Sequence, residues 1–312
     1  MIIFHNEIQK IDAKTRALQE LRSFLDPNEP ELAKILVNTF NNQGKAITYK
    51  EIRESIMQAY EQGGIEEVSL FERLMAEWRQ DYSIFVMRDL SPLWVTAIHE
   101  ANTRLRRKFP EWTWEGFAEG VKEWTDTTSA LFVTNTTNEQ ILAIREAVRL
   151  ATQTHRYGVD ELGRVIRPMV GLNMRQVRAN WNYFNNLIEN GVKEKRAVEL
   201  SARYAARQSR YRGQMIARTE LAFSYNHGAH MGIKAAQAEG LMGQCTKVWC
   251  TAHDERVCPH CGELDGKVID MDDEFDFNTK LTYPGIKETP PAHPHCRCAV
   301  MYKEIAPPTF TA

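Results

Sequence analysis

Apolar residues recur every three or four positions through most of the first 240 residues, which is the period of amphipathic helices. The first such pattern stops at Asp26-Pro27, because proline disfavours a continuing helix, and a second helix is expected over residues 32–42. Thr48 and Glu51 have the spacing of a capping box and predict the start of a third helix. The chain is therefore expected to be mostly α-helical.

Further along, the helical pattern is interrupted at Ser91-Pro92, which suits the first turn of a new helix. Residues 113–138 are rich in threonine and are expected to form a loop or an irregular join. Helix-sized segments follow over residues 140–155, 160–170, 173–190 and 193–239. We expect a helical N-terminal region that contacts a partner over residues 1–157, a second domain over 158–303, and a short tail over 304–312.

The composition fits a globular protein and restricts its partners. The chain has 312 residues, of which 43% are hydrophobic and 26% charged, enough for one or two cores. A formal net charge of -2 excludes a protein that is basic overall and coats nucleic acid everywhere. The sequence shows no secretory signal and no apolar run of about 18 residues, so we expect no membrane contact and synthesis in the cytosol.

The six cysteines all follow residue 244 and include two groups that together can supply one zinc site. Cys258 and Cys261 form a C-x-x-C motif on a predicted turn, and thiols in a reducing compartment favour metal over disulfides. The expected ligands are Cys258, Cys261 and Cys296, completed by His293 or Cys298. Metal binding would offset the entropy of closing the long intervening loop. We therefore expect a small zinc-stapled α+β module at the C-terminus.

The same segment permits catalytic interpretations. His253-x-Glu255 before a C-x-x-C is similar to pieces of the zinc deaminase signature, but only two residues separate Glu255 from Cys258, too few for two helices. A redox C-x-x-C would need a βαβ pattern, which the sequence lacks. A metal-dependent nuclease or other nucleic-acid-modifying enzyme, with Asp254, Glu255 and His260 at the ion, stays open as the alternative function.

Other residues near the C-terminal end have structural interpretations. Cys245 and Cys250 are expected to pack beside Trp249. Arg218 and Glu220 suit a buried ion pair, and they precede small residues at the spacing of closely packed helices, Gly228 and Gly232.

A basic stripe lies on the last long helix. Four arginines repeat at positions i, i+7, i+11 and i+14, which fall on one line along an α-helix: Arg196, Arg203, Arg207 and Arg210. Such a stripe is typical of a solvated face, and it can also contact the phosphates of double-stranded DNA without reading sequence. A general host DNA-binding protein is a third interpretation of this feature.

Several short motifs occur together between about residues 160 and 303. They are Arg218-Thr219-Glu220, Lys247-x-Trp249, Asp254-x-Arg256-x-Cys258-x-x-Cys261, Leu264-Asp265-Gly266 and Pro290-Pro-x-His293-Pro-x-Cys296-Arg-Cys298. In combination they resemble the phage Mu protein F-like head morphogenesis family, the minor capsid proteins of tailed phages and prophages. The resemblance implies a non-enzymatic protein of the virion, assembled in the host cytoplasm, which binds the portal inside the procapsid and aids head assembly.

The resemblance also affects how individual residues are interpreted. It implies contact with capsid or scaffold proteins and, in some members, with packaged DNA, which favours phosphate contact by the arginine stripe. It supports Cys261 and Cys296 as ligand positions. Asp254, Arg256 and Asp265 are then expected to form ion pairs and turns around the site, without a catalytic role. Arg218 and Glu220 are expected to be structural residues of the preceding helix.

Overall fold

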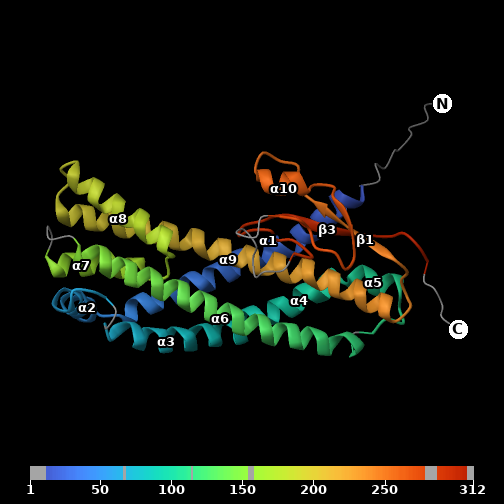
Figure 1. Ribbon diagram of the computed structural model, residues 1–312, viewed down its shortest axis with the longest axis horizontal. Helices are drawn as coiled ribbons and strands as arrows, with labels where there is room; N and C mark the ends of the chain where they lie inside the picture. The colour runs from blue at the N-terminus through green and yellow to red at the C-terminus, as the bar shows by residue number, and fades with distance from the viewer. Residues whose placement is uncertain (1–11, 66–67, 114, 154–157, 278–286, 308–312) are drawn as a thin grey trace, which may run out of the picture. The chain divides into compact units, whose positions relative to one another are not determined.

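The computed structural model describes residues 12–65, 68–113, 115–153, 158–277 and 287–307 (Figure 1). These residues are mostly helical, with a small three-stranded sheet in the C-terminal part, which confirms the predicted fold class. Among them, no helix is both long enough and apolar enough to cross a membrane.

The long helices precede the strands in the sequence, and only the short helix α10 lies between strands. The helices are α1 (Ala13–Ala46), α2 (Tyr49–Gln62), α3 (Leu70–Phe85), a π-helical segment (Val86–Leu90), α4 (Ser91–Ala101), α5 (Thr103–Lys108), α6 (Glu115–Thr152), α7 (Val159–Ile166), a 3-10 turn (Arg167–Met169), α8 (Met174–Glu189), α9 (Glu194–Ala238) and α10 (Pro259–Leu264). The strands are β1 (Cys245–Cys250), β2 (Val268–Asp270) and β3 (Ala299–Glu304).

The chain forms two compact units, each built from separated stretches. The first unit comprises the described residues of Met1–Glu29, Leu93–Lys122 and Arg218–Ala312, and the second comprises those of Pro30–Pro92 and Glu123–Ala217. These ranges do not coincide with the predicted division into 1–157, 158–303 and 304–312, whose first boundary lies outside the described residues. That division stays a prediction.

Local sequence signals predicted several helix ends. At the start of α2, the Thr48 side chain accepts a hydrogen bond from the Glu51 backbone N–H, and the Glu51 carboxylate accepts one from the Thr48 N–H at 2.7 Å. This is the predicted capping box. α9 covers nearly all of the predicted range 193–239. The interruption expected at Ser91-Pro92 is absent, because α3, the π-helical segment and α4 follow one another without a break.

The predicted break at Asp26-Pro27 is wrong, because α1 continues through it. Leu21 and Leu25 are buried before the proline, and Leu32 and Leu36 are buried after it. Burial of this apolar stripe along the whole helix outweighs the cost of the two backbone donors that Pro27 and Pro30 lack.

The predicted loop over residues 113–138 is also wrong, because α6 runs unbroken from Glu115 to Thr152. In the second unit, Phe132, Val133 and Thr137 of this helix are buried. Threonine has a modest helix propensity, but tertiary packing of this kind routinely overrides it.

The sheet of the first unit has β1 at its centre, antiparallel to β2 on one side and β3 on the other. All six residues of β1 are buried. Asn226 of α9 lies against β3: its side-chain N–H donates to the Cys298 carbonyl at 3.2 Å, and its side-chain oxygen accepts from the Val300 N–H at 3.1 Å. Two long-range hydrogen bonds therefore fix the start of β3 to α9.

The close helix packing expected at Gly228 is present between α9 and α4. A Cβ atom on Gly228 would lie 2.7 Å from the Cα of Ile98, and one on Gly232 would overlap the side chain of Asn102. The Asn102 amide donates to the carbonyls of Gly228 and Ile98 at 2.9 and 2.8 Å. Only glycine allows this approach of the two backbones.

Candidate metal centre

The C-x-x-C motif lies at the start of α10 in the first unit. Cys258 is the N-cap of this helix, Pro259 follows at its first position, and the Cys258 sulfur accepts a hydrogen bond from the Cys261 N–H at 3.4 Å. A helix start therefore turns the sulfurs of Cys258 and Cys261 to the same side.

The structure brings this motif together with the distant C-terminal ligands. The Nε2 atom of His293 lies 3.1 Å from the Cys258 sulfur and 3.2 Å from the Cys261 sulfur. The sulfurs of Cys261 and Cys296 are 3.7 Å apart. Ligand atoms group within 4.8 Å in two overlapping sets, one of Cys258, Cys261 and His293, the other of Cys261, Cys296 and Cys298.

These distances suit a tetrahedral zinc ion. With Zn–S bonds of about 2.3 Å, two sulfurs on one ion stand roughly 3.8 Å apart, close to the Cys261–Cys296 separation. Nδ1 of His293 lies 2.8 Å from the Pro294 carbonyl, so an Nδ1–H can donate there and leave the Nε2 lone pair toward the sulfurs. The residues present therefore fit a zinc ion held by sulfur and imidazole.

Charge at the cluster also calls for a cation. Hydrogen bonding to Cys296 and Cys298, together with burial, raises the pKa of the Cys261 thiol. Three buried thiols at this separation cannot all ionise without a compensating positive charge. A bound zinc ion would supply that charge and hold the thiols as thiolates.

An apolar core surrounds the sulfurs. Trp249 packs edge-on against Phe275 at 5.0 Å and against Phe277 at 5.9 Å. Cys261, Cys296 and Cys298 are buried in the same cluster, with Leu264 and Ala292. Because the two overlapping sets offer at least four protein ligands, the cluster favours a closed structural site over a catalytic one.

The two remaining cysteines lie apart from this cluster, on β1. Cys245 and Cys250 are buried in the strand that carries Trp249, as expected for packing residues. Burial raises the pKa of Cys250 to about 11. It is therefore a neutral thiol near neutral pH.

Asp254 connects the two halves of the cluster through an arginine. Each of its carboxylate oxygens accepts a 2.7 Å hydrogen bond from Arg297, which lies between Cys296 and Cys298 in the sequence. Asp254 also accepts from the Arg256 N–H at 3.1 Å. The Arg297 hydrogen bonds, with that of Arg256, hold the pKa of Asp254 well below its usual range.

Arg297 was not singled out from the sequence, although its position between two candidate ligands was a usable signal. Asp265 makes separate contacts nearby. Its carboxylate accepts a hydrogen bond from the Thr251 N–H at 2.9 Å and lies 3.4 Å from Nε2 of His253. The expected ion pairs and turns at Asp254, Arg256 and Asp265 are thus present.

The residues of the alternative nuclease do not converge in the same way. Both oxygens of Asp254 are engaged by Arg297, and the side chains of Glu255 and His260 are exposed. Within the described part of the chain, these three residues do not form a group that could hold an ion.

Residues 182–301 match a family model described as Phage Mu protein F like protein. This segment is similar to the phage Mu protein F-like family. No curated protein and no solved structure matches the chain. The match confirms the resemblance over a range slightly narrower than the predicted 160–303.

Within the phage Mu protein F-like segment, Arg218 pairs with Glu29 and not with Glu220. Its guanidinium donates two 2.8 Å hydrogen bonds to the Glu29 carboxylate. Residues two positions apart on a helix point in nearly opposite directions, so Arg218 and Glu220 cannot face each other. Glu220 is buried, and desolvation raises its pKa to about 8.

The arginine stripe of the same segment is exposed at all four positions: Arg196, Arg203, Arg207 and Arg210. Arg196 pairs with Glu199 at 2.9 Å. By contrast, Arg212, two residues after the stripe on the same helix, is fully buried. It donates to the Gly171 carbonyl at 2.6 Å and to Glu139 at 2.5 Å, and so stabilises the second unit.

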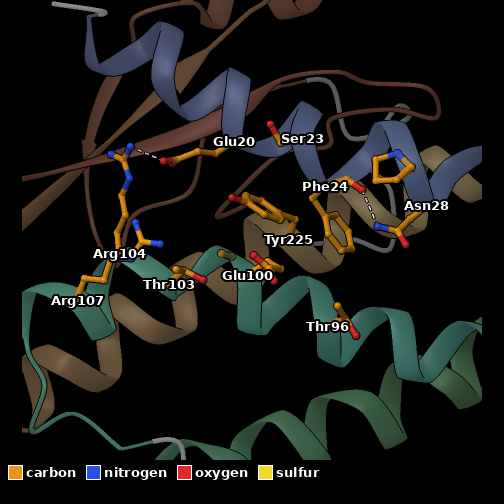
Figure 2. A pocket seen from close by; sticks show the side chains of 12 residues that line it. Glu20, Ser23, Phe24, Asn28, Thr96, Glu100, Thr103, Arg104, Arg107 and Tyr225 are labelled. Atoms are coloured by element: carbon orange, nitrogen blue, oxygen red, sulfur yellow. Dashed lines mark hydrogen bonds and ion pairs between the residues drawn. The ribbon is translucent and has the colours of Figure 1, made fainter.

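Figure 2 shows a separate pocket of about 520 Å³ in the first unit. Tyr225 reaches into it and stacks on Phe24 at a ring separation of 5.7 Å, while Arg104 pairs with Glu20. The remaining lining residues are Ser23, Pro27, Asn28, Thr96, Glu100, Ala101, Thr103 and Arg107. Two carboxylates and two guanidiniums balance in its wall, so the pocket has no net charge that would select an anion or a cation.

Proposed function

We propose that this protein is a minor head protein of a tailed phage or prophage, which binds the portal inside the procapsid and acts in head assembly. The observation that carries the proposal is the family match over residues 182–301. That range contains all five candidate metal ligands and the whole arginine stripe. Capsid or scaffold proteins are further expected partners.

The zinc ion in this proposal is structural and is held by Cys258, Cys261, His293 and Cys296. His293 is favoured over Cys298 as the fourth ligand because its Nε2 contacts both sulfurs of the C-x-x-C motif. Neither Cys296 nor Cys298 groups with Cys258, and Cys296 is preferred because its sulfur lies 3.7 Å from that of Cys261. Cys298 then serves as a packing residue beside the ion.

Contact with DNA is assigned to the arginine stripe. Arg203, Arg207 and Arg210 are exposed along one line of α9, which suits the neutralisation of backbone phosphates. Such contact is independent of sequence and weakens as salt rises, because it releases counterions.

Portal binding is tested by co-expression with the portal and major capsid proteins of the same genome. We expect the chain to copurify with the portal protein, and phage that lack the gene to yield few DNA-filled heads by electron microscopy. Copurification with neither protein would overturn the proposal. So would magnesium-dependent DNA cleavage that Asp254→Ala abolishes, since that result would establish the nuclease alternative.

A further inference from the structure

Tyrosines accompany the arginine stripe on α9. Tyr204 and Tyr211 stand seven residues apart, so they share one line along the helix. This line lies roughly 80° around the helix from that of Arg203, Arg207 and Arg210. The two lines form what we call the arginine–tyrosine face, and all five residues belong to the second unit.

The neighbouring helix widens this face. α8 folds back along the first half of α9 (Figure 1), and the Tyr183 ring of α8 lies 4.9 Å from the ring of Tyr204. Gln176 of α8 donates to the Gln208 carbonyl of α9 at 3.2 Å, which fixes the two helices side by side. The aromatic part of the face is therefore a pair of adjoining rings on a rigid support.

The three arginines and Tyr211 are exposed, whereas Tyr204 is half-buried. Tyr211 keeps 51% of its surface exposed, and the guanidinium of Arg207 lies over the Tyr204 ring at 5.2 Å. Within the described residues, no carboxylate pairs with Arg203 or Arg210. The face thus offers unneutralised cations beside rings, and it carries no carboxylate of its own along the line from Arg203 to Gln214.

We propose that the arginine–tyrosine face binds single-stranded nucleic acid. The guanidiniums would take the backbone phosphates, and the tyrosine rings would stack on unpaired bases, a combination that suits single strands of any sequence. A duplex hides the faces of its bases, so it can use the arginines but not the rings. The inference rests on the nucleic-acid contact in the proposed function and adds the form of nucleic acid preferred.

The dimensions suit short contacts. Tyr204 and Tyr211 are separated by roughly 10 Å along the helix axis, given a rise of about 1.5 Å per residue. That span admits two or three nucleotides of an extended strand, so a base can stack on the exposed Tyr211 while a neighbouring nucleotide meets Arg207 and Tyr204. We expect the loss of one ring to weaken single-strand binding about 10-fold.

The test measures binding of the full-length, zinc-loaded chain to fluorescent oligothymidine of about 20 nucleotides and to a duplex of equal length, by anisotropy at low salt. We expect tighter binding to the single strand. Tyr211→Leu should weaken single-strand binding and leave duplex binding unchanged, while Tyr211→Phe, which keeps the ring, should bind as the original does. Circular dichroism confirms that both variants stay folded.

The arginines provide the second arm. Arg203→Ala and Arg210→Ala should weaken binding to both forms and should each lower the slope of log affinity against log salt by about one. Equal affinity for both forms, with no effect of Tyr211→Leu, would overturn the inference and leave non-specific DNA contact intact. Binding to neither form at low salt would overturn both.

Discussion

Glu220 has a buried carboxyl group, and burial makes its ionised form energetically unfavourable. Its side chain is buried in the first unit, and its Oε2 atom has no hydrogen-bond partner among the described residues. Desolvation raises its pKa to about 8 from an ordinary value of 4.5, so the folded protein keeps the proton that the unfolded chain has lost at neutral pH. Unfolding therefore releases a proton between about pH 4.5 and pH 8.

Glu220→Gln should make stability less dependent on pH. The contribution of the protonated carboxyl is complete below pH 4.5 and is lost as the pH rises to about 8, so the two proteins should be equally stable near pH 4.5. At pH 8 the variant should have the higher free energy of unfolding, on the order of a few kcal/mol. Urea titrations at both pH values measure this, with the exposed Glu239→Gln as the control. A parallel loss of stability at both pH values would contradict the argument.

Asp254 acts on the metal ligands through Arg297, since the two form a bidentate pair beside Cys296 and Cys298. Asp254→Asn should leave one of these hydrogen bonds unmade and loosen the segment that carries the ligands. We expect a 10- to 100-fold lower zinc affinity, roughly the effect of removing an outer partner of a ligand. Competition with a chromophoric chelator measures it. Asp273→Asn, at an exposed carboxylate away from Arg297, should bind zinc normally.

The packing of α4 against α9 depends on glycine at the point of contact. Gly228→Ala would place a methyl group 2.7 Å from the Ile98 Cα, a backbone atom that cannot turn aside. We expect a loss of about 1–3 kcal/mol in the free energy of unfolding. Gly120→Ala on α6 is the matched control, because its Cβ would meet only the end of Met231 at 3.7 Å. That change should instead stabilise the helix by about 0.5–1 kcal/mol. Equal effects of the two changes would argue against close packing.

Helix ends were more predictable than helix continuity. The capping box of Thr48 and Glu51 acts between residues three apart, so the sequence contains the whole interaction. The continuation of α1 through Pro27, and of α6 through its threonines, depends on which distant side chains bury each helix. Helix propensity depends on residue type and near neighbours, so it does not predict such long-range burial.

At the candidate site, residues close together in the sequence were predictable, and partners far apart in the sequence were not. The C-x-x-C spacing identified Cys258 and Cys261, because both ligands lie within one helical turn. The partner of Arg218 is Glu29, 189 positions away, and no pattern in the sequence links the two. The division of the chain into two units was likewise not predictable, because each unit is built from stretches that are far apart in the sequence.

At the scale of the molecule, one ion would link the start of α10 to the segment that carries His293 and Cys296. The sheet of the first unit is small, and β2 has only three residues, so we expect this link to add to the Arg297–Asp254 pair and the Trp249 cluster in fixing the C-terminal module. Zinc that binds only the folded state adds its binding free energy to stability. The native protein should therefore contain one zinc ion per chain, measurable by native mass spectrometry.

Removal of that zinc by a chelator should lower the melting temperature by about 10 °C or more. It should also weaken the near-ultraviolet circular dichroism of Trp249, which packs in the same cluster as the sulfurs. Cys261→Ser should reproduce both effects without a chelator, because Cys261 belongs to both ligand sets. His260→Ala, between the two cysteines but exposed, should keep its zinc, whereas a catalytic ion bound through His260 would be lost. Unchanged melting after complete removal of the metal would show that packing alone holds the module, and the ion would then have no structural role.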